Sequence, residues 1–142
     1  MSDKAQRVAT LAWSPGQIGV ASLIGTPLAG CYMYSENERH WGDEAAGKCA
    51  MAWGLISVPV LFAVTLLAPS GMTLLVVVAA AGALGATART TQGQRFVTHL
   101  FDGGERQTHW MMIGIAFASL VSVRIAVIAL AVIVGLVAPE WL

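Results

Sequence analysis

Residues 110–138 read WMMIGIAFASLVSVRIAVIALAVIVGLVA, and Arg124 is the only charged side chain among them. About 20 consecutive apolar residues are enough for a helix to cross the roughly 30 Å hydrocarbon core of a bilayer. This run is longer, so it predicts a transmembrane helix that tilts or extends beyond the lipid. The chain is therefore expected to be an integral membrane protein.

Three further apolar blocks precede this run. They cover residues 17–34, 50–68 and 72–88. Pro69-Ser70-Gly71 separates the second block from the third, and so short a turn predicts an antiparallel helical hairpin. Pro27 lies within the first block and predicts a kink near Gly25. Together the four blocks predict an all-α bundle of about four spans, forming one transmembrane domain over 1–142.

The composition supports this class and excludes others. Only 11% of the residues are charged, against roughly 25% in soluble domains. Eight basic and eight acidic residues give a net charge of zero, which excludes nucleic-acid binding through a basic surface. The sequence has no nucleophile beside a base, no phosphate-binding glycine loop and no metalloprotease helix. We therefore expect neither an enzyme nor a bound cofactor, and the lipid bilayer as the surroundings.

Two polar segments join the blocks, at 35–49 and 89–109. In the second, apolar residues recur at helical spacing, which predicts a short helix lying in the membrane interface, with an ordinary loop as the alternative. These residues are Phe96, Val97, Leu100 and Phe101.

Charge predicts the orientation of the chain. Four spans put both polar segments on one side and both termini on the other. The segments hold Arg39, Lys48, Arg89, Arg95 and Arg106, whereas the terminal side holds Lys4 and Arg7. Because basic residues are favoured in cytoplasmic segments, the loops should be cytoplasmic and both termini outside. The expected location is the bacterial inner membrane.

Arg124 is the most unusual residue, because it lies near the middle of an otherwise apolar helix. An arginine at the bilayer centre costs roughly 2.5–3.5 kcal/mol on insertion scales and indicates function by default. Every acidic residue lies in a tail or loop. A partner would therefore be another subunit, a lipid phosphate, broken backbone or water. The alternative is that the long helix slides until Arg124 reaches an interface and its side chain extends to water.

Small residues recur every four positions in two of the blocks. They are Gly114, Ala118, Ser122 and Ala126 in the last block, and Ala21, Gly25 and Ala29 in the first. Small residues at this interval let helix backbones approach closely in a membrane, so both sets are predicted packing faces. Packing within the chain and packing against a second chain are both open.

The polar segments also gather ionisable residues. Glu36, Glu38, His40, His99 and His109 form a candidate interaction surface. A metal site there is a weaker alternative, since the histidines and Cys31 and Cys49 follow no recognised ligand spacing. We expect free thiols on the cytoplasmic side. Leu28-Ala29-Gly30-Cys31 resembles a lipoprotein cleavage site, but Pro27 and the long polar lead argue against cleavage.

Several of these residues together resemble an uncharacterised group of small bacterial multi-pass membrane proteins. The resemblance rests on Ser14-Pro15, Ile18, Ala21, Gly25, Pro27-Leu28-Ala29-Gly30, Asn37, Gly103-Gly104, Trp110 and Gly114-Ile115. Thr108-His109 stands where the group has Ser-Asn, and Arg124 lies outside the pattern. The resemblance implies the membrane topology and no activity.

Three functions remain open. The first is a non-catalytic membrane subunit, either an accessory component of a complex or an immunity-type protein, acting through helix faces and loops as a homo- or hetero-oligomer. The second is a small oligomeric transporter or channel with Arg124 lining an anion path. The third is a metal-binding or enzymatic protein that uses the loop histidines.

Overall fold

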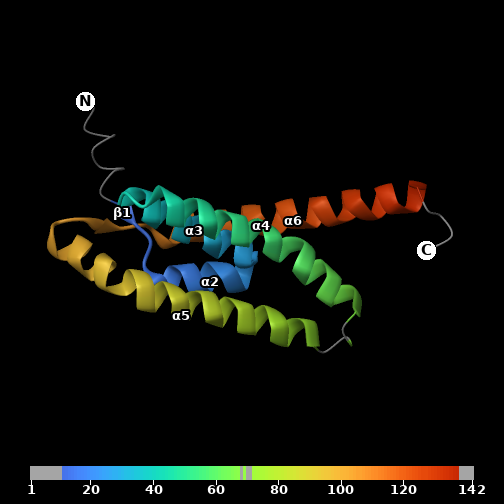
Figure 1. Cartoon of the computed structure of the whole chain (residues 1–142), viewed down its shortest axis with the longest axis horizontal. Coiled ribbons are helices and arrows are strands. Elements are labelled where there is room, and N and C mark those ends of the chain that lie inside the picture. The colour runs from blue at the N-terminus through green and yellow to red at the C-terminus, as the bar shows by residue number, and fades with distance from the viewer. Residues whose placement is uncertain (1–10, 68, 70–71, 138–142) are drawn as a thin grey trace, which may run out of the picture.

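The computed structural model describes residues 11–67, 69 and 72–137, and these are almost entirely helical (Figure 1). The elements, in order, are β1 Leu11–Ala12, α2 Pro15–Gly25, α3 Pro27–His40, α4 Glu44–Leu67, α5 Met72–Phe101, β2 Glu105–Arg106 and α6 His109–Val137. The two strands form a single parallel pair. The all-α fold is confirmed.

The first apolar block forms two helices. Ser14 caps α2: its hydroxyl accepts from the Gln17 amide, while the Gln17 side chain accepts from the Ser14 amide. At Thr26 the backbone has a φ of 134°, and Pro27 follows at the start of α3. The expected kink is thus a full reversal. Ser22 of α2 lies against Gly30 of α3, so the two helices form an antiparallel hairpin.

This hairpin is too short to cross a bilayer. The 11 residues of α2 rise about 16 Å, roughly half of a 30 Å hydrocarbon core. Both of its outer ends lie at one end of the molecule (Figure 1). The block at 17–34 therefore differs from the single spanning helix expected from the sequence, because it forms two short helices joined at Thr26.

Three helices are long and apolar enough to cross a membrane. The qualifying stretches are Glu44–Val64, Leu74–Phe101 and His109–Ala129. The sequence predicted a short interfacial helix or a loop at 89–109. This prediction is wrong for Arg89–Phe101, which continues α5. Of the expected turn at 69–71, only Pro69 lies within the described residues, and Ala138 at the end of the last block lies outside them.

The three spans pack on the hairpin and barely on each other. Glycines allow the close contacts. The Gly19 and Gly85 backbones meet where α2 crosses α5, and a Cβ added at Gly54 of α4 would lie 2.7 Å from the Cys31 Cβ of α3. The buried core lies around the hairpin and includes Ile18, Ala21 and Met33. The hairpin is therefore the central element that joins α4, α5 and α6.

The hairpin also changes the topology. Leu11 lies at the end that carries the turns between α3 and α4 and between α5 and α6, and α6 runs to the opposite end (Figure 1). We call the end that carries β1 and these two turns the polar end. The sequence predicted both termini on one side of the membrane, whereas β1 and the end of α6 lie at opposite ends of the molecule (Figure 1).

Candidate functional site

Asn37 lies at the base of the hairpin and joins three segments. Its Oδ1 accepts from the Trp13 amide at 2.8 Å, and its Nδ2 donates to the Trp13 carbonyl at 2.8 Å and to Gln92 Oε1 at 2.9 Å. Asn37 is 1% exposed and Gln92 is 0% exposed. Because buried amides are stable only when fully paired, this network fixes the hairpin to α5 and to residues 11–14, the entering chain that leads into α2.

A buried carboxylate continues the network. Glu38 is 3% exposed, and its two oxygens accept from Gln92 Nε2 at 2.8 Å and from Arg95 Nη1 at 2.9 Å. Gln92 Nε2 also donates to the Tyr34 carbonyl at 3.1 Å. A buried charge requires this kind of compensation. Glu38, predicted to belong to a loop surface, instead lies on α3 and pairs with α5.

The segment that precedes α6 holds both the entering chain and the start of α2. Gln17 Nε2 donates to the Gln107 carbonyl at 2.8 Å. The Gln107 amide donates to the Ala12 carbonyl at 2.9 Å, next to the pairing of β1 with β2. The short strand pair therefore connects the start of the hairpin to the turn before α6.

His40 and His99 come together beyond this network, as the sequence allowed. Their rings lie edge to face, with centroids 5.3 Å apart. Desolvation lowers the pKa of His40 below its ordinary value, and the neighbouring His99 lowers it further. The indole N–H of Trp41 is buried here with no acceptor among the described residues. A polar hollow of about 470 Å³ adjoins the cluster, lined by Trp41, Gln94, Arg95, Thr98, His99 and Asp102.

The remaining loop candidates do not join this cluster in the described structure. Glu36 forms an exposed ion pair with Arg39 at 3.7 Å, and His109 begins α6 as an exposed residue. Among the described residues no group of three or more His, Cys, Asp or Glu side chains is arranged to hold a metal ion. Cys31 is buried, Cys49 is exposed and both are free.

Arg124 lines a cavity next to the turn between α2 and α3 at Gly25-Thr26-Pro27, which we call the tip of the hairpin. The cavity measures about 390 Å³, and its walls come from the tip, α4, α5 and α6. At the tip, the Thr26 and Ser119 hydroxyls share a hydrogen bond of 2.9 Å. The Arg124 side chain is exposed, and no carboxylate pairs with it in the described part of the chain. A guanidinium thus adjoins a mostly apolar cavity.

The two predicted packing faces have different surroundings. Ala21, Gly25 and Ala29 are buried in the hairpin, and Gly25 lies against the backbone of Ala116 of α6. The four residues of α6 are all exposed. They are Gly114, Ala118, Ser122 and Ala126. Helix α6 instead turns Met112 and Ala116 toward the hairpin, and its small-residue ladder lies exposed within the described structure.

Sequence reasoning missed the buried amide side chains of the network, namely Gln17, Asn37 and Gln92. Their signal was available: uncharged amides within or beside long apolar helices face the protein interior more often than lipid. Asn37 entered only through the resemblance.

No protein-family model, curated protein or solved structure matches this chain.

Proposed function

We propose that this chain is a non-catalytic subunit of a membrane complex and that it binds a second transmembrane chain through the exposed ladder of α6. The observation that carries the proposal is the exposure of Gly114, Ala118, Ser122 and Ala126 on one face. Small residues at four-residue intervals permit close backbone approach between helices in lipid. A partner, identical or different, would occupy this face.

The limited packing of α6 supports the same proposal. Its contacts within the chain are with the hairpin, and it has few or none with α4 and α5. The 29 residues of α6 rise about 44 Å, well beyond the roughly 30 Å hydrocarbon core. A long helix held along only one side by its own chain leaves the opposite side for another protein.

Ala118→Leu is expected to weaken the assembly about tenfold or more, because a larger side chain forced into a close helix contact costs about 1–3 kcal/mol. Crosslinking and native sizing in detergent measure the larger species. Ala52→Leu, which places the same side chain at an exposed alanine of α4, serves as the matched control. A chain that stays monomeric, or an assembly that both variants leave unchanged, contradicts the proposal.

An oligomeric transporter or channel is a second candidate, favoured by the cavity between Arg124 and the tip of the hairpin. Returning hairpins and broken helices commonly form solute sites near the bilayer midplane. Arg124→Leu distinguishes the two functions. Lost anion flux into liposomes with an unchanged assembly, restored by Arg124→Lys, favours transport. Loss of the larger species with no flux in the parent favours the subunit.

We also propose that the polar end faces the bacterial cytoplasm. Four of the five basic residues of the predicted loops lie at or near the helix ends that meet there, and Arg89 lies further along α5; the four are Arg39, Lys48, Arg95 and Arg106. In the sequence, Lys4 and Arg7 precede β1. No basic residue occurs at 65–71 or 125–142. This asymmetry is stronger than a four-span topology gives, and basic residues are favoured in the cytoplasm.

A pair of fusions tests this orientation. Alkaline phosphatase attached after Leu142 is expected to be active, because it folds only outside the cytoplasm. A green fluorescent protein attached at the same position should be dark. The reverse pattern would place the polar end outside and overturn the proposal.

A further inference from the structure

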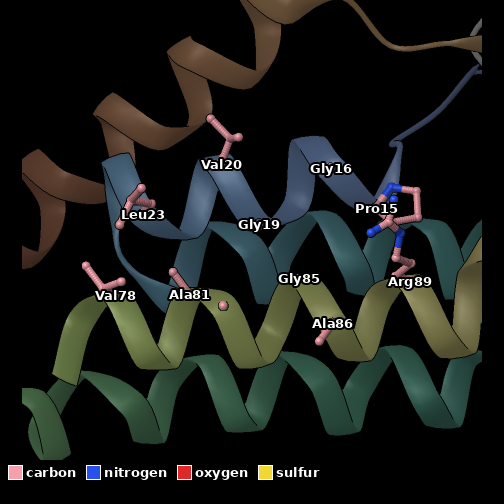
Figure 2. A pocket seen from close by; sticks show the side chains of 11 residues that line it. Pro15, Gly16, Gly19, Val20, Leu23, Val78, Ala81, Gly85, Ala86 and Arg89 are labelled. Atoms are coloured by element: carbon pink, nitrogen blue, oxygen red, sulfur yellow. The ribbon is translucent and has the colours of Figure 1, made fainter. Parts of the chain in front are cut away.

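A groove between α2 and α5 remains outside the networks described above (Figure 2). Its volume is about 590 Å³, within the range of about 300–1,000 Å³ that is typical of ligand sites. Glycines leave much of its surface without side chains, and apolar side chains border it. The lining residues are Pro15, Gly16, Gly19, Val20, Leu23, Val78, Ala81, Gly82, Gly85, Ala86 and Arg89.

The groove has a cationic end. Figure 2 shows the Arg89 side chain beside Pro15, at the N-terminus of α2. Arg89 is exposed, and none of the described carboxylates pairs with it. Gly16 is the second residue of α2, a position where a backbone amide has no acceptor in its own helix. An arginine and a free amide at a helix N-terminus both favour an anion, and phosphate in particular.

The length of the groove matches one leaflet. From Arg89 to Val78 along α5 the rise is about 17 Å, close to the roughly 15 Å that one leaflet contributes to a 30 Å hydrocarbon core. Arg89 directly follows the apolar block at 72–88, which would place it among the headgroups if that block fills the hydrocarbon core, and the apolar lining runs from there to Leu23 and Val78. This juxtaposition of charge and apolar length fits an amphiphile with an anionic head.

We propose that this groove binds one anionic phospholipid, with its phosphate at Arg89 and the Gly16 amide and one acyl chain along α2 and α5. A lipid chain fits better than a helix of another protein. The Gly19 and Gly85 backbones already meet at the floor of the groove, and a helix with side chains is about 10 Å wide. The site is independent of the α6 face, so either proposal can fail alone.

Native mass spectrometry of the full chain, released from nanodiscs of equal phosphatidylglycerol and phosphatidylcholine, tests the headgroup. The parent should retain phosphatidylglycerol, and Arg89→Gln should lower this retention about tenfold, as expected for losing one charge-assisted hydrogen bond. Arg106→Gln removes an exposed arginine outside the groove and should have no effect. Equal retention of both lipids by the parent, or equal losses in the two variants, overturns the proposal.

Photo-crosslinking tests the acyl chain. Phosphatidylglycerol with a diazirine in its tail should label Leu23 and Val78, and Gly82→Leu should abolish this labelling by filling the groove. Nothing lies within 4 Å of a Cβ added at Gly82 or at Gly93, so both leucine variants should fold, and Gly93→Leu, outside the groove, should retain the labelling. Uniform labelling of all three spans, or protection of the groove by a second protein, would contradict a bound lipid.

Discussion

Replacing Asn37 by leucine is expected to release the base of the hairpin and to lower the free energy of unfolding by about 3 kcal/mol or more. The substitution removes three hydrogen bonds and leaves the Trp13 amide, the Trp13 carbonyl and Gln92 Oε1 without their partner. Each buried polar group left unpaired costs about 1–3 kcal/mol. Leucine is close to asparagine in size, so the loss should come from the lost pairing, not from a cavity.

Thermal unfolding in detergent, followed by tryptophan fluorescence, measures this loss. Gln94→Leu is the matched control, because Gln94 is an exposed amide on α5 at the same end of the molecule. That variant should unfold close to the parent. If Asn37→Leu were as stable as Gln94→Leu, the network would not hold the hairpin in place.

The sequence predicted the three spans well because hydropathy alone identifies them. The first block misled for a physical reason: a spanning helix and a returning hairpin bury the same apolar residues, so their hydropathy is identical. The distinguishing feature is Thr26, whose φ of 134° is rarely adopted by a β-branched residue. Its contact with Ser119 comes from α6, 93 residues away. A local reading of the sequence contains no such contact.

The candidate site was predictable in part. The residue types of His40, His99 and Arg124 made them candidates in the sequence. In the structure the two histidine rings lie edge to face, and Arg124 lines a cavity. The ladder of α6 shows the limit of periodicity. A four-residue spacing identifies a face of a helix but not its direction, and the hairpin packs against the face of Met112 and Ala116 instead. Which face turns inward depends on the shape of the neighbour.

Gly25→Ala is the second substitution with a large expected effect. A Cβ at Gly25 would lie 2.6 Å from the Ala116 Cα and 2.8 Å from its carbonyl carbon. Both atoms are backbone, so α2 and α6 must separate. Overpacking of this kind costs about 1–3 kcal/mol, and Gly25→Val should cost more. In an open helical position the same change to alanine would stabilise the chain by up to about 1 kcal/mol.

Whether Gly25→Ala lowers or raises the stability therefore tests the contact between Gly25 and Ala116. Gly114→Ala is the control, because nothing lies within 4 Å of its added Cβ, and it should unfold at or above the parent temperature while Gly25→Ala unfolds below it. A cysteine pair at Thr26 and Ser119, introduced with Cys31 and Cys49 replaced by serine, reports the separation directly. The pair should crosslink readily in the parent background, because the two native hydroxyls are 2.9 Å apart, and poorly with Gly25→Ala. Equal crosslinking and equal stability would mean that α6 does not rest on the tip of the hairpin.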